Sequence, residues 1–413
     1  MSGSIGCRTG ALPSFAMRIL HTSDWHVGRT FHGVDLLGDQ ARVLDAIADL
    51  VVAHGVDVVV VPGDVYDRSI PSADAVAVCN RGFETIRAAG AVIVATSGNH
   101  DSPVRLGAGA AFSAAGGLHL LTRVGGLDTP VLLDDEHGPV AFYGIPYLEP
   151  EITRAELGAP QARSHAEILD VAMARIHADL DARRAEAPGL RSVLLAHAFV
   201  VGGEATGSER SISVGGVETV SAAAFDGVDY VALGHLHSPQ TLAEHVRYSG
   251  SPLPYSFGER SHRKAVWLVD VDATGLAGVE RIDLPVVRGL SQLTGTLDKL
   301  LHDAAFAPAE EHYVSAVLTD PLRPVDAMRA LQARFPYAVH MEWQRPEGNP
   351  ELKYRERVRG RSDVEVAQGF LSDVRSEPSA GEITLLEDAL RSATAAEVLS
   401  ASDAPVDAVE VSA

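Results

Sequence analysis

Residues 57–64 read DVVVVPGD. Four consecutive valines bounded by Asp, Pro and Gly are typical of a strand that is buried on both faces, as in a sheet covered by helices on each side. Asp64 follows directly where this strand would end. In open α/β sheets, ligands gather at the carboxyl ends of the strands. The segment therefore predicts a buried parallel sheet with a functional carboxylate at its edge.

Four further apolar runs end in the same way, in residue types that bind metals. They read ILHTSDWH (19–26), AVIVATSGNHD (91–101), SVLLAH (192–197) and DYVALGHLH (229–237). A single buried histidine is more often a hydrogen-bonded core residue than a ligand, but five recurrences at strand ends are hard to attribute to packing. The candidate metal ligands are Asp24, His26, Asp64, Asn99, His197, His235 and His237.

The chemistry of these candidates narrows the kind of site. They are carboxylates, imidazoles and an amide, without a thiolate. This set suits Mn, Fe or Zn in a mixed nitrogen and oxygen site, and it argues against a zinc finger or an all-oxygen calcium site. Two divalent ions about 3.5–4 Å apart can deprotonate a bridging water and neutralise charge on an attacked phosphoryl group. We therefore expect two divalent metal ions and phosphoester hydrolysis.

His100 and Asp101 follow Asn99 directly. If the Asn99 amide faces a metal, the neighbouring imidazole can reach the substrate side of the site, with a carboxylate behind it. We expect His100 to stabilise the transition state and protonate the leaving oxygen, oriented by Asp101. The alternative is that His100 only caps the turn, because turn residues cluster locally for backbone reasons.

The segments between the first three runs have helical periodicity. Leu44, Ile47 and Val51 fall on one face of a helix that Gly55 ends, and Ser72 caps a second helix. Such βαβαβ alternation implies parallel strands with helices outside. Further on, we expect strands near 131–133 and 140–143 and a helix over 163–187. Alternation between 240 and 284 favours strands that complete a second sheet.

Beyond residue 287 the pattern restarts. YVSAVLTD (313–320), PVDAMRALQARF (324–335) and YAVHMEW (337–343) predict a small β-α-β unit. Ser362 and Glu365 form a capping box ahead of two amphipathic helices. We place the boundaries at 1–16 (disordered extension), 17–285 (main α/β domain), 286–347 (small α+β domain), 348–361 (linker), 362–400 (C-terminal helices) and 401–413 (disordered tail).

The composition indicates the cellular compartment in which the chain would work. Cys7 and Cys79 are the two cysteines, too few for a disulfide scaffold, so a reducing cytoplasm fits. No run approaches 18 consecutive apolar residues, which argues against a membrane span, and residues 1–16 make a poor signal peptide.

The formal net charge of −21 argues against tight DNA binding by this chain alone, because counterion release by Lys and Arg normally dominates DNA affinity. Metal ions and arginine-bearing loops can still supply local positive charge. The arginines that flank the site motifs are Arg29, Arg68, Arg105, Arg210 and Arg260. We assign the first four to DNA contact; the alternative is that each is an ordinary solvated side chain.

The order D-x-H, G-D-x-x-D, G-N-H-D, a lone His after a strand and then G-H-x-H resembles the calcineurin-like metallophosphoesterase superfamily. HTSDWHVGRTFHG (21–33), GDVYDRSIPS (63–72) and RYSGSPLPYSFGE (247–259) resemble, more narrowly, the bacterial nuclease subunits that work with an SbcC-type ATPase. This resemblance is strong over residues 17–285 and rests on layout beyond them. It implies a two-sheet αββα metallophosphoesterase sandwich, a cap domain over the cleft, and C-terminal helices that bind the ATPase.

By matching positions, the resemblance also implies roles for the candidate residues. Asp24, His26, Asp64 and His237 would hold one ion, and Asp64, Asn99, His197 and His235 the other, with Asp64 as the bridge. His100 would be the catalytic histidine that assists departure of the 3′ oxygen, with Asp101 orienting it. Mn²⁺ is the implied metal, with Mg²⁺ or Fe²⁺ as alternatives. Asp67 stands where some archaeal and eukaryotic relatives have a second active-site histidine, which leaves the balance of exonuclease and endonuclease action open.

The function implied is that of a DNA nuclease, acting as a double-strand exonuclease and a single-strand or hairpin endonuclease in end processing, recombination and repair. Its partners would be DNA and the ATPase, in a heterotetramer that contains a homodimer of this chain. One alternative is a stand-alone metallophosphoesterase that acts on small phosphoesters, since one metal core serves many substrates. Another is a scaffold without catalysis, against which the complete ligand set argues.

Overall fold

The computed structural model describes residues 17–200, 202, 204, 209, 220–344, 360–374 and 377–402, and for 373, 374 and 394–402 it describes the backbone alone. The chain divides into two compact units. One unit runs to Ser291 and includes Glu311–Tyr313; the other takes Gln292–Glu310 and the residues from Val314 on. The predicted extension 1–16 lies outside the described residues, as do most of the predicted linker 348–361 and tail 401–413.

The first unit contains two six-stranded sheets. The first sheet has the order β14 (Gly275–Asp283), β13 (Ala265–Asp272), β1 (Met17–His21), β4 (Val58–Pro62), β5 (Val92–Thr96) and β6 (Leu118–Leu120). From β1 to β6 the neighbours are parallel, as the alternation of strands and helices predicted. β13 and β14 extend the other edge in antiparallel pairing.

The second sheet has the order β11 (Gln240–Ala243), β12 (Val246–Tyr248), β10 (Tyr230–Gly234), β9 (Arg191–His197), β8 (Gly138–Ile145) and β7 (Val131–Asp135). Its four central strands are parallel, and the two edge strands are antiparallel to their neighbours. We expected the alternating segments after residue 263 in this sheet as well, which was wrong. They form β13 and β14 in the first sheet, where Met17 pairs with Val271 and Val269 is buried in the core between the sheets.

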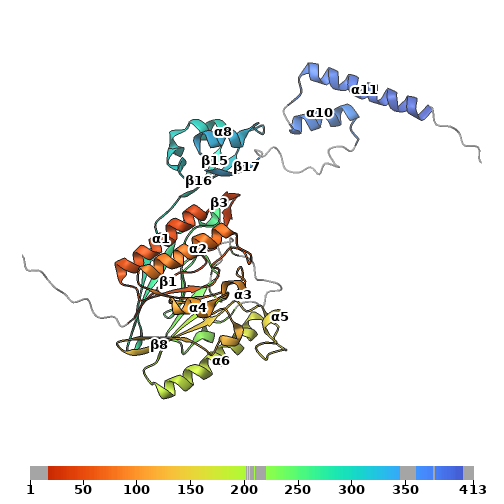
Figure 1. Cartoon of the computed structure of the whole chain (residues 1–413). Helices are drawn as coiled ribbons and strands as arrows, with labels where there is room; N and C mark the ends of the chain where they lie inside the picture. The colour runs from red at the N-terminus through yellow and green to blue at the C-terminus, as the bar shows by residue number, and fades with distance from the viewer. Residues whose placement is uncertain are drawn as a thin grey trace, which may run out of the picture. The chain divides into compact units, whose positions relative to one another are not determined.

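Helices lie on the outside of both sheets. Those of the first unit are α1 (Leu37–His54), α2 (Ala73–Ala88), α3 (Pro103–Leu106), α4 (Ala110–Ala115), α5 (Pro150–Thr153) and α6 (His165–Glu186). Figure 1 shows α1 and α2 on one side of the sheets and α6 on the other. Ile19 and Val60 of the first sheet share a buried core with Phe142 and Leu195 of the second. The predicted αββα sandwich is confirmed.

Local sequence signals set the helix ends. Gly55 adopts a left-handed conformation with φ 61° and donates its N–H back to the last turn of α1. The Ser72 hydroxyl accepts from the N–H of Ala75 at 3.2 Å and so begins α2. At α6, Ser164 and Glu167 form a capping box. Each cap lets a helix return the chain to the next strand, which brings the strand ends to one edge.

The second unit is centred on a three-stranded sheet. The elements around this sheet are β15 (Leu290–Gly295), α7 (Leu297–His302), β16 (Tyr313–Leu318), α8 (Ala327–Arg334) and β17 (Ala338–Trp343), and the first residues of β15 and β16 belong to the first unit. β16 and β17 are parallel and joined through α8, as the β-α-β pattern predicted. Leu300, Leu331 and Phe335 are buried against the sheet and give this unit a core of its own.

Two C-terminal helices follow, α10 (Asp363–Val374) and α11 (Ala380–Ser402). The predicted capping box is present, because the N–H of Glu365 donates to the Ser362 hydroxyl at 3.3 Å and the N–H of Ser362 donates to the Glu365 carboxylate at 2.8 Å. α11 continues to Ser402, slightly past residue 400 where we placed its end. Among the described helices, none is both long and apolar enough to cross a bilayer.

Candidate metal centre

The candidate ligands come from strands of both sheets, at their carboxyl ends. Asp24 and His26 follow β1, Asp64 follows β4, Asn99 follows β5, His197 ends β9, and His235 and His237 follow β10. All are buried except Asn99, which is half-buried. The two sheets thus bring segments far apart in sequence to one place, as expected for an α/β fold.

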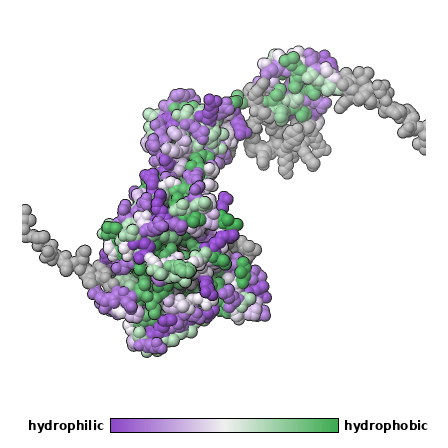
Figure 2. Space-filling view, in the orientation of Figure 1, coloured by the Kyte–Doolittle hydropathy of each residue, from purple (hydrophilic) through white to green (hydrophobic). Residues whose placement is uncertain are grey.

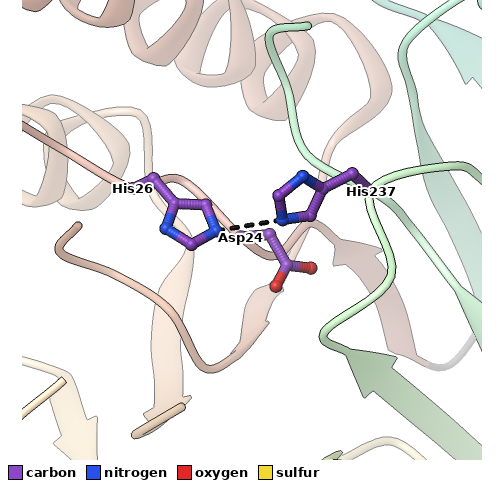
Figure 3. Close-up of side chains that lie close together, drawn as sticks. All are labelled: Asp24, His26 and His237. Atoms are coloured by element: carbon purple, nitrogen blue, oxygen red, sulfur yellow. Dashed lines mark hydrogen bonds between the residues drawn. The ribbon is translucent and has the colours of Figure 1, made fainter. Parts of the chain in front are cut away.

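Asp24, His26 and His237 form the first cluster, with one ligand atom of each within 4.8 Å of the others. The Nε2 atoms of the two histidines lie 3.1 Å apart, and both rings lie beside the Asp24 carboxylate (Figure 3). Burial lowers the pKa of both imidazoles well below its ordinary value, and neighbouring positive or imidazole groups lower it further. Both rings are therefore neutral near pH 7, the form in which histidine binds a metal.

His197 anchors the second cluster. Its Nδ1 donates to the Pro62 carbonyl at 2.9 Å, so its Nε2 carries the lone pair. That Nε2 lies 2.9 Å from the Asn99 side-chain oxygen. Burial lowers the pKa of His197 to about 3, which keeps the ring neutral. Two hydrogen-bond acceptors this close repel each other unless a cation lies between them. A carbonyl on the far ring nitrogen is also the usual support of a metal-ligating histidine.

The Asp64 carboxylate lies between the two clusters. Its Oδ2 is 3.5 Å from His26 Nε2 and 3.6 Å from His197 Nε2. Burial, followed by the charge of Asp64, raises the pKa of Asp24 well above its ordinary value. A divalent cation relieves this repulsion, so the residues present fit two metal ions with Asp64 as a shared ligand.

His235 lies at the edge of the second cluster. Its ring centroid is 5.3 Å from that of His197, and its backbone N–H donates to Asp24 Oδ1 at 2.9 Å. Burial lowers the pKa of the His235 ring to about 3. The structure thus brings every predicted ligand into one contiguous group of side chains.

The backbone of this group is strained. Asp24, His26, Asp64 and His235 have φ values of 53°, 45°, 49° and 109°. Each such conformation in a non-glycine residue costs on the order of 1–3 kcal/mol and persists where surrounding structure enforces it, often at functional sites. In the described part of the chain only two other non-glycine residues share it. No sequence pattern indicated these conformations.

Two glycines leave space for the ligands. A Cβ on Gly63, whose φ is +91°, would lie 2.4 Å from His197 Nδ1. A Cβ on Gly98 would lie 2.1 Å from Asp64 Oδ1. Any side chain at either position would displace a candidate ligand. This explains why glycine occupies the first position of G-D-x-x-D and of G-N-H-D.

His100 lies at the rim of the centre and is 8% exposed. Its Nδ1 donates to the Asp67 backbone carbonyl at 2.8 Å, and its ring centroid is 4.6 Å from that of His26. This bond fixes the ring and leaves Nε2 as the atom that can exchange a proton with a substrate. The position suits the acid role predicted for His100.

The expected contact between Asp101 and the His100 ring is not formed. The Asp101 carboxylate instead accepts from the backbone N–H groups of Val65, Tyr66 and Gly98, at 3.1, 2.9 and 2.9 Å. Burial and then the charge of Asp64 raise its pKa to about 7. Adjacent residues of a turn direct their side chains differently, so Asp101 ties two ligand loops together while the Asp67 carbonyl orients His100.

Three of the predicted arginines surround the loop that carries Asp67. Arg29 Nη1 lies 3.5 Å from Asp67 Oδ1, and Arg68 Nε lies 3.7 Å from Asp67 Oδ2. Arg105 donates to the Ser69 carbonyl at 3.3 Å. Arg260 instead donates to the Phe257 carbonyl at 3.2 Å, and Arg210 lies outside the described residues. Positive charge therefore gathers next to His100.

Sequence reasoning missed the residues that support the centre from behind. Gln40 of α1 donates to the His26 carbonyl at 2.7 Å and accepts from the N–H of Gly28 at 2.9 Å. Lys264 donates to the His237 carbonyl at 2.7 Å and forms a buried ion pair with Glu259. The signals available were a glutamine within the apolar face of α1 and a lysine next to the apolar run of β13.

The family is shown by comparison with known proteins. The model of the calcineurin-like phosphoesterase family matches residues 17–239, more than half of the 413-residue chain, so the chain belongs to this family. It is a metal-dependent hydrolase of phosphoesters. One similar solved structure is the crystal structure of TT1561 of Thermus thermophilus, with 15% identity, 66% of this chain and 100% of that chain covered, and a TM-score of 0.39.

Proposed function

We propose that this chain is an SbcD-type DNA nuclease, the subunit that hydrolyses phosphodiesters in a complex with an SbcC-type ATPase during DNA end processing, recombination and repair. The observation that carries the proposal is the gathering of Arg29, Arg68 and Arg105 around the loop that orients His100. Positive side chains beside a metal centre attract a polyanionic backbone and align its phosphates.

The candidate ligands have defined tasks in this proposal. Asp24, His26 and His237 would hold one ion and Asn99, His197 and His235 the other, with Asp64 shared. Bound ions, for which we propose Mn²⁺, supply an activated water and neutralise phosphoryl charge. His100, held through its Nδ1, delivers a proton from Nε2 to the departing 3′ oxygen. Arg29 and the exposed Arg68 hold the phosphates that flank the cleaved bond.

The C-terminal helices are the proposed attachment for the ATPase. Phe370 on α10 is 58% exposed and Leu385 on α11 is 70% exposed. Figure 2 shows hydrophobic residues on the visible face of these helices. Helices dock into a partner's groove or coiled coil through exposed apolar side chains of this kind. We further propose a homodimer of this chain within a heterotetramer.

A stand-alone phosphoesterase is the second candidate, and the net charge of −21 favours it because such a chain repels DNA overall. Both candidates share the metal centre. They differ in whether a polynucleotide is a better substrate than a small diester.

The deciding experiment compares two substrates in Mn²⁺ and in Mg²⁺, with and without the ATPase. One is a labelled duplex with a free end, and the other is bis(p-nitrophenyl) phosphate. We expect both to be hydrolysed, with the ATPase accelerating cleavage of the duplex only. Hydrolysis confined to the small diester under every condition would contradict the nuclease and favour the stand-alone enzyme.

A further inference from the structure

A cleft of about 620 Å³ opens beside the metal centre, and residues of α3 and α5 are part of its lining. Asn99 and Asp101 lie in its lining, so the cleft is continuous with the second ligand cluster. Its volume is in the range of pockets that hold a small molecule. The catalytic scheme above leaves this space unused.

The walls of the cleft are mainly apolar. Val104 on α3 and Ile152 on α5 line it and are 83% and 76% exposed. The half-buried Tyr147 ring also lines it, with its hydroxyl 3.3 Å from Glu149 Oε2. Large apolar side chains exposed around a concave site mark a place where a ligand removes them from water. The tyrosine adds a flat surface suited to an aromatic partner.

The charged residues of the cleft favour the base of a nucleotide over its phosphate. Glu149 and Glu156 line the cleft, together with Arg123. Together with Asp101, these side chains give three carboxyl groups against one guanidinium, which disfavours a phosphate. A nucleobase has apolar faces for stacking and N–H donors at its edge, which carboxylates accept. Phosphate is therefore directed to the metals and the base to the cleft.

We propose that this cleft binds the unpaired nucleoside that adjoins the scissile phosphate, with its base against Val104, Ile152 and Tyr147. In a duplex the faces of a base are stacked on its neighbours and its edge is paired, so a base whose faces contact these side chains must first leave the duplex to occupy the cleft. This inference rests on the proposed function, because it requires a nucleic acid as the substrate. It adds that the enzyme would prefer frayed ends and unpaired strands.

The test is calorimetric titration of the full-length, Mn²⁺-loaded chain with two probes, deoxyadenosine 5′-monophosphate and inorganic phosphate. We expect the nucleotide to bind at least about 10-fold more tightly, as stacking of one base allows. Val104→Asp and Ile152→Asp should each remove most of that difference and leave the affinity for phosphate unchanged. Phe112→Asp is the matched control, because Phe112 is 88% exposed and does not line the cleft. It should change neither affinity.

Equal affinity of the unaltered chain for the two probes would overturn the inference, as would a nucleotide preference that survives both cleft substitutions. The proposed nuclease function fails by a different result, namely no cleavage of duplex or hairpin DNA by a chain that hydrolyses bis(p-nitrophenyl) phosphate. A nucleotide preference lost on cleft substitution in such a chain would support the nucleoside cleft in a small-substrate enzyme.

Discussion

His100 differs from the candidate metal ligands in the hydrogen bonds of its side chain and its backbone. Its side chain is bonded to the Asp67 carbonyl, while its backbone N–H donates to Asp64 Oδ1 at 2.9 Å. His100→Ala keeps the backbone bond and removes the ring. We expect cleavage of the labelled duplex, whose departing 3′ alkoxide needs a proton, to fall by about 10²–10⁴-fold while both metals stay bound, measured as duplex turnover and as metal content after dialysis.

The exposed turn residue His137 supplies the control, since His137→Ala should alter neither quantity. His26, Asp67 and His100 also lie close enough together to form a third possible ligand group. Loss of a metal from His100→Ala would assign His100 to that group and would remove its role as an acid.

Gly98 allows a second test at the level of one atom. An added Cβ would lie 2.1 Å from Asp64 Oδ1 and 2.4 Å from the Asp64 backbone nitrogen, and neither atom can move without displacing the shared ligand. Gly98→Ala should therefore weaken Mn²⁺ binding by at least about 10-fold, as is usual when a supporting position of a metal site is altered. Titration calorimetry on the metal-free chain measures this. Gly38→Ala on α1, where a Cβ meets nothing within 4 Å, should bind Mn²⁺ normally.

At the scale of an element, the loop from β12 to β13 depends on a buried ion pair. Lys264 and Glu259 are 7% and 1% exposed, and the lysine also donates to Ser251 Oγ at 3.0 Å. Lys264→Met leaves the Glu259 charge buried without its partner, which typically destabilises a protein by about 3–5 kcal/mol. Urea denaturation of the metal-free chain should show this loss in the free energy of unfolding.

Removing both charges tests the cause. Lys264→Met combined with Glu259→Leu should recover most of the stability, because no unpaired charge remains. Arg281→Met breaks the exposed pair of Arg281 with Asp283, 3.0 Å apart, and should cost less than about 1 kcal/mol. A double variant no more stable than Lys264→Met would show that packing of the lysine chain, and not its charge, holds the loop.

The sequence predicted correctly those strands that consist of consecutive apolar residues. The valines of 58–61 and the apolar runs before Asn99 and His235 form strands as expected, because each is buried on both faces. β13 and β14 were placed in the wrong sheet, because the pairing of β13 with β1 joins residues more than two hundred positions apart, and β14 follows β13. The contacts of Lys264 and Asp101 are with residues of nearby loops, whose backbone path the pattern of apolar residues does not indicate. The directions of the side chains within G-N-H-D (98–101) depend on backbone angles that the motif alone does not indicate.

For the whole molecule, metal binding should be coupled to stability. Asp24 and Asp64 repel each other across a buried site, and a bound cation stabilises the folded state alone. At a metal concentration about 100 times the Kd, this linkage contributes about 2.7 kcal/mol. Scanning calorimetry should therefore show that EDTA lowers the unfolding midpoint of the first unit by about 5–10 °C. Asp64→Asn should abolish most of this dependence, and an EDTA effect that persists undiminished in that variant would place the stabilising metal elsewhere.

The metal centre and the helices proposed to bind the ATPase lie in different units of the chain. Substitutions should therefore weaken partner binding without changing catalysis. Aspartate in place of Phe370 or Leu385 puts a charge into the apolar surface that the ATPase is proposed to cover, at a cost of a few kcal/mol on binding, about 10²-fold in Kd. Each variant should keep its turnover of bis(p-nitrophenyl) phosphate, since no ligand of the metal centre comes from α10 or α11 in the described part of the chain. Sedimentation of labelled chain with the ATPase measures the Kd, and Leu132→Asp, an exposed apolar position on β7, should leave it unchanged. An unaltered Kd in both helix variants would move the ATPase attachment away from these helices and leave the metal centre's assignment intact.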